Sequence, residues 1–139
     1  MRPMELLNSL LAGSARLKEL TGRIRPGAEL VVSGISDSQK RHLAWWAVRE
    51  SGMKGIYVAW NEMQARQAMA DLSWLTGDRA VFFAGREIML YDVEARSFEQ
   101  TYDRITALVR ILEGDYDFVV TSADALLHRL MPPKELARH

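Results

Sequence analysis

The sequence predicts an α/β fold with an open, mainly parallel four-stranded sheet and helices on both faces. Short runs rich in β-branched and aromatic residues alternate along the chain with helical segments of about 9–17 residues, a pattern typical of right-handed βαβ units. Helix-capping residues also stand where several of these helical segments should begin. The four strands are expected at residues 29–33, 56–60, 80–84 and 117–121.

The N-terminal part is expected to be a separate helix and linker. Leucines at helical spacing between residues 6 and 11 predict a short amphipathic helix. The stretch TGRIRPG, residues 21–27, contains two glycines and a proline and predicts a linker or tight turn. We therefore expect two parts, residues 1–26 as helix and linker and residues 27–139 as the α/β domain.

Helices are predicted between and after the strands. Asn61 with Gln64, and Ser97 with Gln100, form the pattern of a capping box at two helix starts. The helix after Ser97 has one apolar face, formed by Phe98, Tyr102, Ile105, Val109 and Leu112. The expected helices are 37–51, 61–75, 97–114 and 123–131.

Composition excludes several classes of function. The chain has 139 residues, 48% hydrophobic and 26% charged, which is ordinary for a globular domain. Its 18 basic and 18 acidic side chains cancel, so no bulk field attracts nucleic acid or an anionic membrane. Because cysteine is absent, disulfides, thiolate nucleophiles and cysteine zinc sites are excluded, as suits a cytoplasmic protein. No apolar run approaches the roughly 20 residues that span a bilayer.

The loop after the first predicted strand resembles a phosphate-binding loop that has lost its working parts. A working loop reads G-x-x-x-x-G-K-[ST], in which backbone N–H groups surround the phosphates and the hydroxyl binds magnesium. Gly34 and Lys40 have this spacing, but Gln39 replaces the second glycine and Arg41 replaces the hydroxyl. Asp37 also adds a negative charge where the helix N-terminus favours an anion. The relict loop comprises Gly34, Ser36, Asp37, Gln39, Lys40 and Arg41.

An acidic residue to hold magnesium is also missing at the strand ends. The third strand ends at Ala84 and Gly85 and the fourth at Thr121 and Ser122, so neither supplies the carboxylate that such enzymes use. The simpler interpretation is that Ser36 or Asp37 caps a helix and that Lys40 is solvated. We therefore expect no catalytic residue, no bound cofactor and no metal site in this chain.

Other candidate sites are weaker. The three histidines are scattered without further metal ligands at useful spacing, and Ser33 lacks the G-x-S-x-G frame of a nucleophile elbow. The four tryptophans could stack on bases, but tryptophans at helix faces and strand ends usually belong to a core or an interface. The histidines are His42, His128 and His139, and the tryptophans are Trp45, Trp46, Trp60 and Trp74.

A charged loop at residues 86–96 surrounds four consecutive apolar residues. An apolar patch in such a setting predicts docking against another segment or domain, and packing into the chain's own core is the alternative. The candidate docking loop is Ile88, Met89, Leu90 and Tyr91, and we expect these residues to be partly exposed or covered by a neighbour.

Several stretches together are similar to a known family. The degenerate loop GISDSQKRHLA is followed by GIYVAWNEMQARQAMADL, by REIMLYDVEARSFEQTYDRITALVRIL and by DFVVTSADALLHRLMPPKEL. This order resembles the extreme N-terminal module of bacterial transcription-repair coupling factor (Mfd), over about residues 30–136. In that family the module is similar to the first domain of the excision-repair helicase subunit UvrB, with its nucleotide site lost.

The resemblance implies a fragment of a larger protein. The parent would be a cytoplasmic, ATP- and magnesium-dependent DNA translocase of the helicase-like hydrolases, acting in transcription-coupled nucleotide excision repair. It would contact RNA polymerase, UvrA and DNA, with no membrane partner, and its ATPase motor would lie downstream of these residues. The resemblance therefore implies a degenerate, helicase-type P-loop-like domain that acts as a non-catalytic scaffold.

Two other functions compete with the scaffold. One is an active P-loop nucleotide-binding enzyme, which would depend on Lys40 and the helix N-terminus after Ser36. The other is a stand-alone small α/β regulatory or binding domain unrelated to repair. The oligomeric state of the chain and any direct contact with DNA or UvrA do not follow from the sequence.

Overall fold

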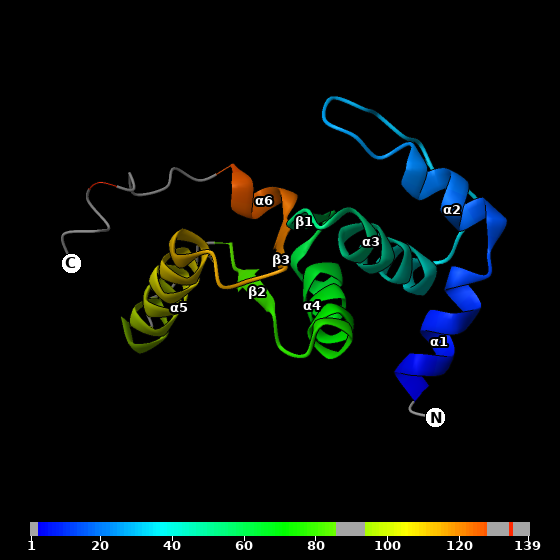
Figure 1. The fold of residues 1–139 in the computed structure, drawn as a ribbon. Coiled ribbons are helices and arrows are strands. Elements are labelled where there is room, and N and C mark those ends of the chain that lie inside the picture. The colour runs from blue at the N-terminus through cyan, green and yellow to red at the C-terminus, as the bar shows by residue number, and fades with distance from the viewer. Residues whose placement is uncertain (1–2, 86–93, 128–133, 135–139) are drawn as a thin grey trace. The chain divides into compact units, whose positions relative to one another are not determined.

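A computed structural model describes residues 3–85, 94–127 and 134 of the chain (Figure 1). The chain divides into two compact units, residues 1–53 and residues 54–139. The boundary between the two units lies after residue 53, whereas the sequence predicts a domain boundary after residue 26. The domain boundary stays a prediction. Within the described residues, no helix is both long and apolar enough to cross a lipid bilayer.

Six helices and three strands are present in the described residues. The helices are α1 (Pro3–Ala12), α2 (Ala15–Gly22), α3 (Asp37–Ser51), α4 (Glu62–Thr76), α5 (Glu94–Glu113) and α6 (Ala123–Leu126). The strands are β1 (Gly55–Ala59), β2 (Ala80–Phe83) and β3 (Phe118–Ser122).

The first unit consists of α1, α2 and α3. Helix α2, which the sequence did not predict, begins after Ser14, whose side chain accepts a hydrogen bond from the Leu17 N–H at 3.4 Å. None of the residues of α2 is buried. Helix α3 has the predicted bounds, 37–51, and ends at Gly52, whose positive φ of 68° suits a residue without a side chain.

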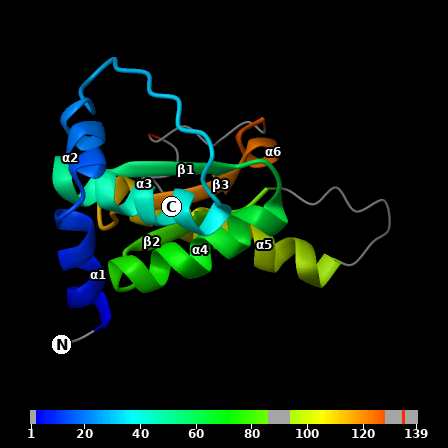
Figure 2. The same cartoon turned by 90° about the vertical axis from the view of Figure 1, so that its right-hand side faces the viewer.

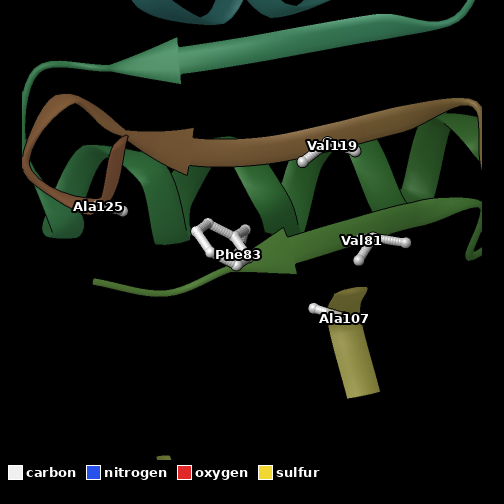
Figure 3. Packing of buried hydrophobic residues seen from close by; sticks show 5 residues of the cluster. All are labelled: Val81, Phe83, Ala107, Val119 and Ala125. Carbon is white, nitrogen blue, oxygen red and sulfur yellow. The ribbon is translucent and has the colours of Figure 1, made fainter. Parts of the chain in front are cut away.

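The second unit contains a small open sheet in which all strands are parallel. Strand β3 lies between β1 and β2 (Figure 3). Val119 is level with Ile56 on one side and with Val81 on the other. The predictions of an α/β class and an open parallel sheet are therefore confirmed, with three strands.

Helices α4 and α5 cover opposite faces of this sheet. On β2, Phe82 has the guanidinium of Arg66 from α4 over its ring, whereas the neighbouring Phe83 has that of Arg104 from α5. Successive side chains of a strand point to opposite faces, so the two helices lie on opposite sides (Figure 2). The strand order is β1-β3-β2, so the connection β1–α4–β2 crosses the sheet in one direction and β2–α5–β3 returns in the other. Parallel crossovers have the same handedness, and two crossovers in opposite directions can share it only if their helices lie on opposite faces.

Each face of the sheet has its own core. The residues of α4 that pack against one face are small or aliphatic and buried: Ala65, Ala68, Leu72 and Leu75. The core on the α5 face is a cluster of Val81, Phe83, Ala107, Val119 and Ala125 (Figure 3). Burial of one Leu, Val or Phe side chain contributes about 1.5–3 kcal/mol, so both layers stabilise the unit.

The strand predicted at residues 29–33 is not formed in the structure. These residues have no regular secondary structure, and the Val31 side chain is 97% exposed. A β-branched run has the local preference for a strand, but a strand also needs a neighbour for its backbone N–H and C=O groups. The other three strands each lie within one residue of the predicted bounds.

Helix α5 differs from its prediction in two respects. It begins at Glu94, before the predicted cap at Ser97. The described members of its apolar face also point away from the sheet, since Tyr102 is 71% and Leu112 52% exposed. A different face, with the buried Ala107 and the half-buried Leu108 and Ile111, contacts the core, since the small Ala107 side chain allows close approach to β2.

Candidate functional site

The relict phosphate loop lies at the N-terminus of α3, in the first unit. Gly34 has a φ of +75°, and an added Cβ would meet nothing within 4 Å. Glycine is therefore favoured here by backbone conformation and not by lack of space. The residues before it form no strand, so the strand–loop–helix frame of a phosphate loop is not formed in the structure.

Ser36 and Gln39 form a capping box. The Gln39 N–H donates to Ser36 Oγ at 3.3 Å, and the Ser36 N–H donates to Gln39 Oε1 at 2.8 Å. The expected N-cap at Ser36 is thus confirmed. In a phosphate loop, backbone N–H groups of this kind point to the ligand. Here two of them are bonded within the chain.

Lys40 is paired with an acidic residue one turn away. Its Nζ lies 3.0 Å from Asp37 Oδ1, and both side chains are more than half exposed. The hydrogen bond from Lys40, followed by its positive charge, lowers the pKa of the Asp37 carboxyl below its ordinary value of 3.8. The lysine that would reach the outer phosphates of a nucleotide therefore already has an anionic partner. Arg41, which replaces the magnesium-binding hydroxyl, is 9% exposed.

A shallow apolar pocket lies beside the loop within the first unit. Its volume is about 280 Å³, and it is lined by Leu20 of α2, by Ile24, by the segment 30–35 and by α3. Lys40 is the one charged residue of this lining. Because aliphatic side chains offer no hydrogen bonds, this surface cannot replace the lost phosphate contacts.

The carboxyl edge of the sheet is the other place where an α/β fold positions a site. Ligands in open α/β sheets bind where neighbouring strands are followed by elements on opposite faces. Here β1 leads to α4, and β3 leads to α6, whose Ala125 belongs to the core on the other face. The sequence did not predict this meeting of β1 and β3, because strand order is not readable from local patterns.

The polar residues at this edge act as helix caps. Asn61 Oδ1 accepts from the Gln64 N–H at 2.9 Å, and Ser122 Oγ accepts from the Ala125 N–H at 3.3 Å. The cap at Asn61 was predicted and is confirmed, and the cap at Ser122 was not predicted. Two residues follow each strand directly: 60–61 after β1, 84–85 after β2 and 123–124 after β3. Among these described residues the only carboxylate is that of Asp124, which lies inside α6.

The remaining candidates do not form a site in the described residues. His42 lies on α3 with Nδ1 2.8 Å from the Ser38 carbonyl oxygen, and the described part of the chain contains no group of three potential metal ligands. Trp45 and Trp46 are buried, whereas Trp60 and Trp74 are exposed. His128, His139 and the candidate docking loop 88–91 lie outside the described residues.

Sequence reasoning missed one buried charged residue of the second unit. Arg104 is 8% exposed, donates a hydrogen bond to the Ala84 carbonyl oxygen, and lies 4.4 Å from the centroid of the Phe83 ring. A buried arginine on a helix between apolar residues has no distinctive local signal, because its role depends on the strand that it faces.

Comparison of the chain with protein-family models, curated proteins and solved structures gave no match.

Proposed function

We propose that this chain is a non-catalytic scaffold module at the N-terminus of a transcription-coupled DNA repair translocase. The proposal starts from the resemblance of residues 30–136 to the coupling factors. In this proposal the chain is a degenerate, helicase-type P-loop-like domain that shapes a UvrB-like surface and packs against neighbouring domains. It carries no nucleotide chemistry of its own.

The N-terminus of α3 is the observation that supports a non-catalytic role. The backbone N–H groups of Ser36 and Gln39 are bonded within the capping box, and the Lys40 amine is bonded to Asp37. A nucleotide would have to displace these contacts, and each neutral hydrogen bond of the capping box is worth about 0.5–1.5 kcal/mol. Replacement of the magnesium-binding hydroxyl by Arg41 acts in the same direction.

The proposal assigns the other activities to the rest of the parent protein. ATP and magnesium would bind in a downstream motor, and the parent would contact stalled RNA polymerase, UvrA and DNA in the cytoplasm. We also propose that residues 29–33 pair as a fourth strand within the parent. The exposure of Leu30, Val31 and Val32 supports this, because apolar side chains of this size are usually covered in a complete domain.

Strand-selective repair in the source organism tests the proposal. One strain would lack codons 30–136 in frame, and a second would carry Lys40→Ala. Repair of ultraviolet photoproducts is then measured separately on the transcribed and non-transcribed strands of an active gene, with protein abundance followed by immunoblot.

We expect the deletion to remove the faster repair of the transcribed strand and Lys40→Ala to preserve it. An unchanged strand preference in the deletion strain would reject the role in transcription-coupled repair. Loss of the preference in Lys40→Ala, at normal abundance, would instead indicate that the loop takes part in nucleotide chemistry.

A further inference from the structure

We draw no further inference here: the strongest candidate, the exposed apolar stripe of Tyr102, Ile105, Val109 and Leu112 along α5, carries none, because nothing in the described part of the structure shows what covers it.

Discussion

The guanidinium of Arg104 lies 4.4 Å from the centroid of the Phe83 ring, which joins the middle of α5 to the end of β2. The same side chain donates a hydrogen bond to the carbonyl oxygen of Ala84, the residue that follows the strand. Arg66 makes a similar contact with Phe82 on the opposite face, at 5.0 Å, but its side chain is 64% exposed. Arg66 also forms an ion pair with Glu62, one turn away on α4, at 2.6 Å. The two arginines therefore make similar contacts with a ring of β2 but differ in burial and in their polar partner.

Replacement of Arg104 is predicted to destabilise the protein more than replacement of Arg66. Arg104→Ala should lower the free energy of unfolding by about 2 kcal/mol, because the half-buried Ala84 carbonyl loses its donor and the buried Phe83 ring loses its cation. Arg66→Ala should cost less than about 1 kcal/mol, since exposed ion pairs and cation–π contacts are weak. Urea unfolding of both variants measures the difference. Equal costs would mean that Arg104 does not hold α5 on the sheet.

Lys54 is predicted to stabilise the end of α5. Its Nζ donates to the Gly114 and Tyr116 carbonyl oxygens, the latter at 2.8 Å, and lies 4.2 Å from the Tyr116 ring centroid. Lys54→Met keeps most of the side-chain volume but removes these contacts and should cost about 1 kcal/mol in urea unfolding. Lys18→Met on the exposed α2 is the control and should change little. A cost no larger than that of Lys18→Met would exclude this role.

The capping box at the relict loop gives a prediction about helix stability. Ser36→Ala should lower the free energy of unfolding by about 1 kcal/mol, because the Gln39 N–H loses its acceptor. Gln39→Gly, which restores the second glycine of a phosphate loop, should cost about as much, since it removes the reciprocal bond and introduces glycine into a helix. Ser38→Ala, in the same turn, should be nearly neutral in the same thermal or urea measurement. A neutral Ser36→Ala would show that the cap is unimportant.

The ion pair between Asp37 and Lys40 predicts a dependence of stability on pH. Because the folded pKa of Asp37 lies below its ordinary value of 3.8, the ionised carboxylate stabilises the folded chain above that value. This stabilisation is lost as the pH falls through the folded pKa. Asp37→Asn should therefore be less stable than the parent chain at pH 7, and the difference should shrink in acid. In a Lys40→Ala background, the stability difference between Asp37→Asn and its parent should no longer shrink in acid. If it still shrinks, a group other than Lys40 stabilises the Asp37 carboxylate.

Local patterns were sufficient for part of the fold and of the relict loop. Helix α3, the cap at Ser36 and three strands follow from β-branched runs, glycines and capping residues, all of which act within a few positions of the chain. The strand at 29–33 failed because its formation depends on a partner strand, which no local pattern specifies. The apolar face of α5 was found, but which face meets the sheet depends on the fit of Ala107 against β2 and on Arg104.

Calorimetric titration of the chain with magnesium and ATP tests most directly whether this is a non-catalytic module. The loop has lost its second glycine at Gln39 and its hydroxyl at Arg41, and Lys40 is bonded to Asp37. We predict no magnesium-dependent binding and no hydrolysis of ATP, and a weak, magnesium-independent interaction of phosphate with the helix N-terminus would agree with this account. Lys40→Ala is the control. Tight, magnesium-dependent binding of ATP that is lost in Lys40→Ala would contradict the scaffold role and establish an active nucleotide site.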